Sequence, residues 1–392
     1  MRYKLGEIFN LQMGKTPDRH SPKFWNEGTE PWISIADLTK CIKYIENTAE
    51  KITATAVDES GIKIIPKNTV IMSFKLSIGK VAITPKEMYS NEAIMSFIDK
   101  GVLKIEPVYL YYLLMHKDWD TDTNKAVMGK TLNKATLSQM TVNIHGYSEQ
   151  LEIIKALDAA SSIIAARKQQ LTELDNLIKA RFVELFGDPM DNPLGLDRVN
   201  ISTVIGGKVS NGFFAKRDDY CNDGNVKVLG VAHVVNRMYS NIEDLPTTNG
   251  SETDILKYGV KYGDMLFCRS SLVAAGIGKA SIVPQGTPNN VLFECHVIRL
   301  PLDLDKCVPE FMQVLSTTDY FRNQVISRSK TATMTTIGQD GILKTDIILP
   351  PLEFQRQFLQ FVKQTDKSKV AVQKALDEAQ LLFDSLMQKY FG

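Results

Sequence analysis

The sequence predicts a mixed α/β fold in which two similar globular domains are separated by two long antiparallel coiled-coil helices, related by an internal pseudo-twofold repeat. Residues 130–187 align with residues 335–392 without a gap, and each of these segments ends in a long run of apolar residues at helical spacing. The pairs that stand 205 positions apart are Thr131 with Thr336, Leu132 with Ile337, Gln150 with Gln355, Phe186 with Phe391, and Gly187 with Gly392. A solenoid unit repeats every 20 to 50 residues or so, and we therefore expect two copies of a whole domain with an attached helix.

The repeat and the helix signals divide the chain into four parts. Ser148 can cap the first long helix, and Gly187 followed by Pro189 can end it. With 392 residues, the chain is long enough for two separate cores. We expect a first domain over residues 1–147, a central helix over 148–187, a second domain over 188–352 and a terminal helix over 353–392.

Both predicted helices carry apolar residues at alternating spacings of three and four, which is typical of a coiled-coil seam. Arg167 and Arg181 interrupt the first run, and Thr365 and Lys369 interrupt the second. Two seams in one chain most simply pack on each other, and the twofold repeat then makes the pair antiparallel. The alternative is two amphipathic helices, each lying on its own domain. The predicted seam residues are Leu157, Ile164, Leu171, Leu174 and Ile178 in the first helix, and Val362, Val372, Leu376, Phe383 and Leu386 in the second.

Each domain contains three apolar runs that predict buried strands. In the first domain they span residues 31–38, 69–74 and 79–83, and in the second 226–234, 264–268 and 278–283. The two sets align with small gaps, which places Ile33 opposite Val228 and Gly79 opposite Gly278. The long helices thus remain more alike between the two copies than the domains do, as expected if the two domains bind different targets.

Composition is that of an ordinary globular protein, with 44% apolar and 23% charged residues and a net charge of +1. No apolar run approaches the roughly 18 to 20 residues of a membrane span, and the N-terminus has no apolar leader, so we expect a cytoplasmic protein without membrane contact. The cysteines are odd in number, widely spaced and without a C-x-x-C motif, which favours buried thiols over disulfides or a zinc site. They are Cys41, Cys221, Cys268, Cys295 and Cys307.

Basic residues gather at equivalent places in the two domains. Residues 125–134 and 322–330 each hold three cations and no acid, and glycine-containing turns at residues 13–20, 73–80 and 268–279 carry further basic and polar side chains. Such turns can bring cations and backbone N–H groups to phosphates while Arg, Asn or Ser side chains reach base edges, which favours DNA over the alternative of solvated loops. The predicted DNA-binding residues are Lys15, Lys75, Lys80 and Lys130 in the first domain, and Arg217, Arg269, Lys279 and Arg328 in the second.

A search for catalytic or metal-binding patterns identifies none. The GIGKA segment ending at Ala280 lacks the first glycine and the hydroxyl residue of a phosphate-binding loop. Asp188-Pro189-Met190 begins like an aminomethyltransferase motif but lacks its second proline and aromatic residue. The five histidines are dispersed, with no H-E-x-x-H and no local Cys/His cluster. We therefore predict no catalytic residue and no metal ligand.

The order of several short segments resembles the specificity subunit of type I restriction-modification enzymes over the full length of the chain. The segments are LGEIFNLQMGKTP at residues 5–17, PWISIADL, SFKLSIGKVAI, NEAI at 91–94, SEQ before the central helix, LFGDP at its end, and PLEFQRQF before the terminal helix. None of these short segments is specific for the family alone, but their order together with the duplication is. The second domain departs from the family pattern, with IGGKVSNGFFAKRDD at residues 205–219 in place of the GKTP-type opening.

This resemblance implies that each domain is a target recognition domain that reads one half of a split sequence in double-stranded DNA. It also implies that the helices hold the halves apart and dock two methylation subunits, which carry S-adenosylmethionine and methylate flipped adenines. Restriction subunits complete the complex, and the specificity chain itself binds no cofactor and is not an enzyme. One alternative is the specificity chain of a related type II restriction-modification enzyme. Another is a scaffold whose coiled coil joins two protein-binding domains, without salt-dependent DNA affinity.

Overall fold

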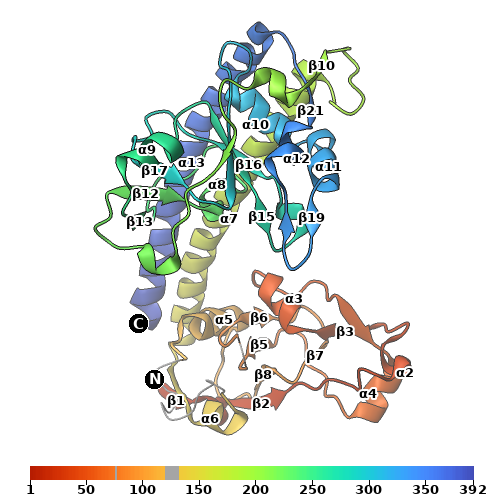
Figure 1. The fold of residues 1–392 in the computed structure, drawn as a ribbon. Coiled ribbons are helices and arrows are strands. Elements are labelled where there is room, and N and C mark those ends of the chain that lie inside the picture. The colour runs from red at the N-terminus through yellow and green to blue at the C-terminus, as the bar shows by residue number, and fades with distance from the viewer. Residues whose placement is uncertain (76, 120–131) are drawn as a thin grey trace. The chain divides into compact units, whose positions relative to one another are not determined.

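The computed structural model describes residues 1–75, 77–119 and 132–392 in two compact units. Unit 1 comprises Met1–Lys168 with Lys374–Gly392, and unit 2 comprises Gln169–Gln373. Each unit therefore combines one globular domain with part of helix α7 (Tyr147–Phe186) and part of helix α13 (Leu352–Phe391) (Figure 1). Both helices begin one residue before the predicted start, at Tyr147 and Leu352.

The domain of unit 1 is built on three small sheets. Its four-stranded antiparallel sheet has the order β2-β8-β5-β6, and its three-stranded sheet has the order β4-β3-β7 with β3 parallel to β7. A two-stranded ribbon, β1-β9, joins the start and end of the domain. The strands are β1 (Arg2–Lys4), β2 (Phe9–Met13), β3 (Glu30–Ile33), β4 (Glu50–Ile52), β5 (Val70–Ser73), β6 (Val81–Ile83), β7 (Tyr89–Ser90), β8 (Ile94–Asp99) and β9 (Thr141–Asn143). The short helices are α1 (Leu5–Ile8), α2 (Pro22–Trp25), α3 (Ile35–Lys40), α4 (Ala54–Ser60), α5 (Pro107–His116) and α6 (Lys134–Gln139).

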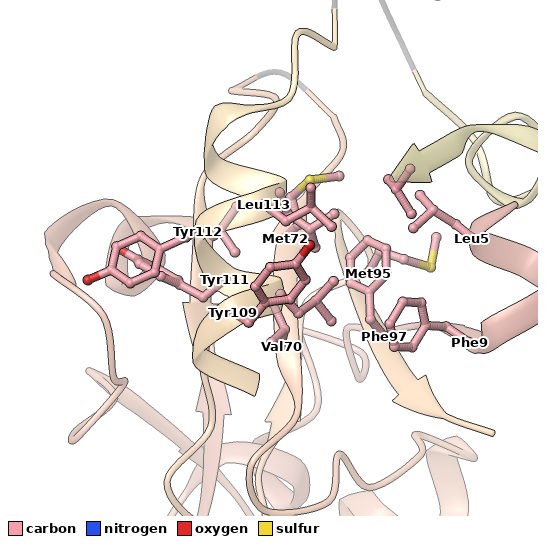
Figure 2. Packing of buried hydrophobic residues seen from close by; sticks show 14 of the residues in the cluster. Leu5, Phe9, Val70, Met72, Met95, Phe97, Tyr109, Tyr111, Tyr112 and Leu113 are labelled. Carbon is pink, nitrogen blue, oxygen red and sulfur yellow. The ribbon is translucent and has the colours of Figure 1, made fainter. Parts of the chain in front are cut away.

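The main core of unit 1 lies between the four-stranded sheet and helix α5 (Figure 2). Val70 pairs with Phe97 and Met72 with Met95, and because side chains alternate along a strand these four share one face of the sheet. Buried residues of α5, Tyr109 among them, cover that face. The same cluster takes in side chains from the first part of α7 and the last part of α13, so both long helices are integral to this core.

The domain of unit 2 repeats this plan. Its sheets have the orders β11-β18-β14-β16, β13-β12-β17 and β10-β21, with β12 parallel to β17. A further three-stranded sheet has the order β15-β20-β19. The strands are β10 (Arg198–Asn200), β11 (Ser210–Asn211), β12 (Val226–Leu229), β13 (Thr247–Thr248), β14 (Asp264–Cys268), β15 (Ser270–Ser271), β16 (Ala280–Ile282), β17 (Val291–Phe293), β18 (Val297–Pro301), β19 (Lys330–Thr331), β20 (Thr335–Thr336) and β21 (Asp346–Ile348). The helices are α8 (Val231–Val234), α9 (Glu252–Tyr258), α10 (Pro309–Thr317), α11 (Asp319–Ser327) and α12 (Gln339–Leu343), with 3-10 turns η1 (Ile201–Val204), η2 (Arg217–Asp219) and η3 (Ala274–Gly276).

The two long helices pack against each other within each unit. In unit 1, Ile153 and Leu157 of α7 share a core with Met387 of α13, and in unit 2, the Phe182 ring of α7 lies 5.7 Å from the Phe358 ring of α13. The start of one helix thus meets the end of the other, which makes the pair antiparallel. The predicted fold class is confirmed, and the reading in which each helix lies only on its own domain is wrong.

The predicted seam residues occupy the covered side of each helix. Leu157, Ile178, Val362 and Val372 are buried, and the other six predicted positions are half-buried. Phe182, Phe186 and Met387, which fall outside the predicted run, are also buried, at 1%, 1% and 4% exposure. The covered side is therefore wider near the domains than a strict seam, because these ends pack on domain cores as well as on the other helix.

Two strands end earlier than the sequence predicted. The run at residues 31–38 leaves the sheet after Ile33 and becomes helix α3, and the run at 226–234 leaves it after Leu229 and becomes α8. Ser34 caps α3, because its hydroxyl accepts from the backbone N–H of Asp37 at 3.1 Å. Apolar residues continue from each strand into the helix that follows it. The length of the apolar run therefore did not reveal where the strand ends.

The parallel strand pairs also correct the alignment of the two domains. Ile33 pairs with Ser90 and Leu229 with Phe293, so the counterpart of Ile33 is Leu229 rather than Val228. Gly79 and Gly278 do correspond, since both have positive φ, 86° and 63°, at the end of the same turn. Among the described residues, none of the helices combines the length and the apolar character that a membrane span needs.

Candidate nucleic-acid interface

In unit 1, four chain segments meet at residues 90–94, where β7 ends and β8 begins; we call this place the strand junction. The backbone N–H groups of Gly14 and Lys15 donate to the carbonyl oxygens of Ile94 (3.1 Å) and Ser90 (2.8 Å). The N–H of Asn91 donates to the carbonyl of Ile33 at 3.0 Å, which ties the end of β3 to the same place. Phe74, just after β5, donates to the carbonyl of Ala93 at 3.0 Å. The loops that follow β2, β3 and β5 therefore leave from one point.

Unit 2 forms the equivalent strand junction at residues 293–297. The N–H of Phe213 donates to the carbonyl of Phe293 at 2.7 Å, and that of Arg269 donates to the carbonyl of His296 at 2.8 Å. Glycine precedes the crossing in both units, and a Cβ atom would lie 2.3 Å from a carbonyl oxygen at Gly14 and 2.2 Å at Gly212. Only glycine allows the backbones to approach so closely. Both units thus present their variable loops from the same backbone frame.

Three predicted DNA-binding residues of unit 1 lie on loops that leave the junction. Lys15 is exposed, and its ammonium donates to the carbonyl of Ser60. Lys75 is half-exposed, with its ammonium 5.4 Å from the centre of the Phe74 ring. Lys80 is half-buried and follows the positive-φ turn at Gly79. Lys130 lies outside the described residues.

In unit 2, Arg269 and Lys279 lie at opposite ends of one turn. The backbone of Cys268, next to Arg269, donates to the carbonyl of Lys279 at 2.8 Å. The guanidinium of Arg269 donates through Nη1 to the carbonyl of Cys295 (3.1 Å), and the Lys279 ammonium donates to Asn236 Oδ1 (2.6 Å). Both side chains are half-buried and held in place by these bonds.

Arg328 and Arg217 lie beside two different sheets of unit 2. Arg328 ends α11, two residues before β19, and its Nη1 donates to the carbonyl of Gln324 at 2.9 Å. Arg217 is exposed in η2, on a segment that runs beside β13, since the hydroxyl of Thr248 donates to the carbonyl of Asp219 at 2.7 Å. The structure therefore brings Arg328 toward the turn that carries Arg269 and leaves Arg217 beside a different sheet.

The turn after β14 and the segment after α11 form one basic surface. Strand β20 pairs with β15 on one side and with β19 on the other, and this ribbon joins the two segments (Figure 1). Residues 265–293 and 320–339 contain no acidic residue. They contain five cations, of which Lys330 is exposed and the others are half-buried: Arg269, Lys279, Arg322 and Arg328. A surface with this charge attracts phosphates. It could not be predicted from the sequence, because the strands that form it have only two residues each.

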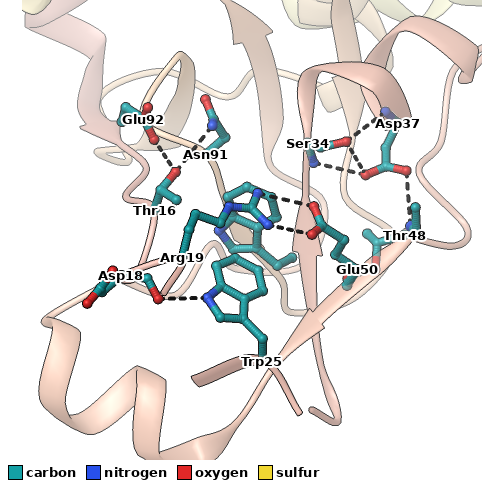
Figure 3. Close-up of polar contacts among 12 residues, drawn as sticks. Thr16, Asp18, Arg19, Trp25, Ser34, Asp37, Thr48, Glu50, Asn91 and Glu92 are labelled. Carbon is teal, nitrogen blue, oxygen red and sulfur yellow. Dashed lines mark hydrogen bonds and ion pairs between the residues drawn. The ribbon is translucent and has the colours of Figure 1, made fainter. Parts of the chain in front are cut away.

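A stack of one cationic and two aromatic side chains, which the sequence did not reveal, lies beside the loop that carries Lys15 (Figure 3). The guanidinium of Arg19 lies 4.0 Å from the centre of the Trp25 ring and 4.6 Å from that of Trp32. It also forms a two-pronged ion pair with Glu50. The indole N–H of Trp32 donates to the carbonyl of Lys15 at 3.1 Å. The stack therefore holds the loop at residues 14–20 against the three-stranded sheet.

The cysteines are all free thiols. Burial raises the pKa of Cys41 to about 11 and that of Cys307 to about 12, so both stay protonated at neutral pH. Cys268 and Cys307 are buried as predicted, but Cys221 is exposed, and the prediction of a buried thiol is wrong there. Within the described ranges, no group of His, Cys, Asp and Glu side chains is placed to hold a metal ion.

Fold and site together define a class of protein: a duplicated α/β binding protein with paired long helices and basic loops on a shared backbone frame. Residues 1–176 match the family model described as the type I restriction modification DNA specificity domain. The chain is 27% identical over 252 residues to the type I restriction enzyme MjaIX specificity subunit of Methanocaldococcus jannaschii, which covers 59% of this chain and 57% of that protein. It is 26% identical over 160 residues to the EcoR124I/EcoR124II specificity subunit of Escherichia coli, covering 39% of each chain. The matches thus span about half or less of these relatives.

Two solved structures share the fold over the whole chain. The type I restriction-modification S subunit from M. genitalium aligns with a TM-score of 0.53 at 12% identity, covering 100% of this chain and 96% of that one. A chain from a study of complex assembly and conformational transition of the type I restriction-modification system aligns with a TM-score of 0.55 at 15% identity, covering 100% and 97%. The resemblance to the specificity subunits of type I restriction-modification enzymes, which the sequence indicated, is confirmed.

Proposed function

We propose that this chain reads a split DNA sequence, with one half-site for each domain. The observation that carries the proposal is the duplicated strand junction, from which loops bearing Lys15, Lys75 and Lys80 leave in unit 1 and loops bearing Arg269 and Lys279 leave in unit 2. Because the frame is the same and the loops differ in sequence and length, the two domains suit two different base sequences. Cations on these loops contact the phosphates, and polar side chains on the same loops read base edges.

The two long helices serve as the docking surface for two methylation subunits. Their covered sides are occupied by each other and by the domains, yet both also carry large exposed apolar residues. Val370, Leu381 and Leu382 of α13 are 70%, 72% and 52% exposed, and Ile163, Leu177 and Val183 of α7 are 46%, 48% and 50% exposed. Apolar side chains exposed in this number suit a protein partner.

In this proposal, catalysis belongs to the partners. The methylation subunits carry S-adenosylmethionine and modify adenines flipped out of the duplex, and restriction subunits join the same complex. The chain supplies sequence recognition and spacing, binds no cofactor and carries no catalytic residue. Its place is in the cytoplasm, with the DNA.

The test is to map methylation in cells. The chain is expressed with its methylation subunit in a host without other adenine methylation, and the modified positions are read by single-molecule sequencing. We expect a motif of two short half-sites separated by unspecified bases, with an adenine modified on each strand. The methylation subunit expressed alone is the control. A continuous motif, or no motif that depends on this chain, would overturn the proposal.

A further inference from the structure

Two large apolar side chains stand exposed at the tip of the turn between β14 and β16. Leu272 is 82% exposed and Val273 is 64% exposed, and Ala274 and Ala275 beside them are exposed as well. Single exposed apolar residues are common on protein surfaces, and a solvated loop would explain them if the tip were isolated. Two further observations at this tip favour a bound partner.

First, the tip is held in one conformation by its own contacts. Ser270 and Ser271 pair with β20, and the N–H of Gly276 donates to the carbonyl of Val273 at 3.0 Å. The Arg322 guanidinium, from α11, donates through Nη2 to the carbonyl of Ala275 at 3.2 Å. Since the tip is already ordered, binding through it costs little further conformational entropy.

Second, the tip rises from the basic surface. Lys330 on β19 pairs with Thr336 on β20, which pairs in turn with Ser270 on β15. Neighbouring strands lie about 4.8 Å apart, so the backbone of Lys330 lies roughly 10 Å from that of Ser270 at the base of the tip. The two segments that form this surface contain no acidic residue over 265–293 and 320–339. An exposed apolar tip with cations around it is complementary to a DNA duplex, in which apolar base faces lie between two phosphate backbones.

We propose that Leu272 and Val273 form an apolar wedge that inserts between stacked bases of the second half-site and distorts the duplex there. The inference rests on the proposed function and adds to it a residue-level mechanism. Insertion moves two apolar side chains out of water and lets the surrounding cations reach more phosphates, which offsets the cost of unstacking. Bases that are easier to unstack are then favoured at that position, so the wedge contributes to sequence preference without hydrogen bonds to bases.

The experiment uses the full chain in complex with its methylation subunits and a duplex that carries the mapped motif. The fluorescent base 2-aminopurine replaces bases of the second half-site one at a time, leaving out the methylated adenine. The test variant is Leu272→Ser with Val273→Ser. The matched control is Leu256→Ser, since Leu256 is 86% exposed in the same unit but lies on α9 near Glu252 and Asp254.

With the unsubstituted chain we expect the fluorescence to rise at one base step. The double variant should lose that rise and bind about tenfold more weakly, the order of magnitude for two apolar side chains no longer buried. A mismatch placed at the same step should bring the two affinities together, because the unstacking is then already done. Leu256→Ser should leave both readouts unchanged.

Three results would overturn the wedge while the proposed function stands. In the first, sequence-specific binding occurs without a fluorescence rise at any position. In the second, replacing thymine by uracil abolishes the effect of the double variant, which would indicate a contact with a thymine methyl in the groove. In the third, the double variant loses its methylation subunits, which would make the tip a protein-docking site. Loss of sequence-specific binding by the unsubstituted chain would instead contradict the proposed function.

Discussion

Gln150 and Gln355 make the same three hydrogen bonds, one glutamine in each unit. The Oε1 of Gln150 accepts from the N–H of Glu106 (3.1 Å), and its Nε2 donates to the carbonyls of Lys104 (3.2 Å) and His145 (3.0 Å). The corresponding partners of Gln355 are the N–H of Val308 (2.8 Å) and the carbonyls of Lys306 (3.3 Å) and Pro350 (2.8 Å). Both glutamines are almost fully buried, at 1% and 0% exposure. Each therefore anchors a long helix to the backbone of its domain.

Replacing Gln355 by Leu should destabilise unit 2. The apolar side chain leaves the buried N–H of Val308 and two carbonyls without partners, and each such group costs about 1 to 3 kcal/mol. The measurement is urea unfolding of the whole chain. Gln360→Leu, at an exposed position of the same helix, is the control. Equal losses in the two variants would show that the buried hydrogen bonds do not matter.

Tyr111 should make the protein less stable at alkaline pH. Burial, followed by the nearby Cys41 and Asp158, raises its pKa to about 12. In the unfolded chain the pKa is near 10, so the stabilisation is complete below that pH and is lost as the pH rises to about 12. At pH 11 the loss is about 1.4 kcal/mol for this one group. In Tyr111→Phe, the fall in unfolding free energy between pH 8 and pH 11 should shrink by about that amount. Tyr3→Phe, at a half-exposed position, should keep the full fall.

Arg269 and Lys279 should affect DNA binding in different ways. If Lys279 neutralises a phosphate, Lys279→Ala weakens all DNA sequences equally and lowers the slope of log affinity against log salt by about one, and Lys80→Ala does the same in unit 1. If Arg269 reads a guanine, Arg269→Ala costs about 1 to 3 kcal/mol and relaxes only the second half-site. Lys257→Ala, an exposed cation on α9, serves as control. Unchanged affinity and slope in all variants would remove these loops from the interface.

A fragment of residues 1–187 should fold and form a dimer. The core of unit 1 includes Phe383 and Met387 of α13, which the fragment lacks. Their counterparts 205 positions earlier are Ile178 and Phe182 of α7, so a second copy can supply equivalent side chains. We expect a dimer by light scattering and, with methylation subunits, recognition of an inverted repeat of the first half-site. Phe182→Ser should prevent dimer formation. A fragment that stays unfolded with its partner present would show that the predicted domain boundary is wrong.

The length of α7 should set the gap between the half-sites. Duplicating residues 171–174 (LTEL) adds four residues, or about 6 Å, whereas one base pair advances about 3.4 Å. The insert also turns the following helix by about 40° beyond a full turn, close to the rotation of one base pair, so a gap one base pair longer is expected. The methylated motif reports the result. Four residues inserted at the exposed Gly195 should leave the gap unchanged. A changed half-site with an unchanged gap would contradict the prediction that the length of α7 sets the gap.

Long elements and the repeat could be predicted because their signals are local and redundant. Helices α7 and α13 show many turns of apolar spacing, and β14 (Asp264–Cys268) is a short, mostly apolar run with all five residues buried. The pairing of the two helices followed from symmetry, which needs no knowledge of side-chain contacts. These features depend on residues that are close together in the sequence, and such local patterns are the ones that a sequence shows most clearly.

Features made by distant segments could not be predicted. Strands β15, β19 and β20 have two residues each and exist only because remote backbones pair. The contact of Arg19 with Trp32 and Glu50 likewise depends on how the loop crosses the sheet. Nor could apolar content reveal where β3 ends and α3 begins, because the break depends on the cap formed by Ser34. Basic turns could be recognised in the sequence, but their common origin at the strand junction could not.

The hydrogen-bonded frame of the two domains also records how they have diverged. Measured between corresponding residues, the separation is 198 positions at Gly14 and Gly212, 196 at Ile33 and Leu229, 199 at Gly79 and Gly278, and 203 at Ser90 and Phe293. It returns to 205 at Gln150 and Gln355. Insertions and deletions have therefore accumulated in the loops between fixed points and have left the attachment to the helices in register. Under the proposed function, a loop that contacts DNA can thus change in length while the helices that dock the methylation subunits stay as they are.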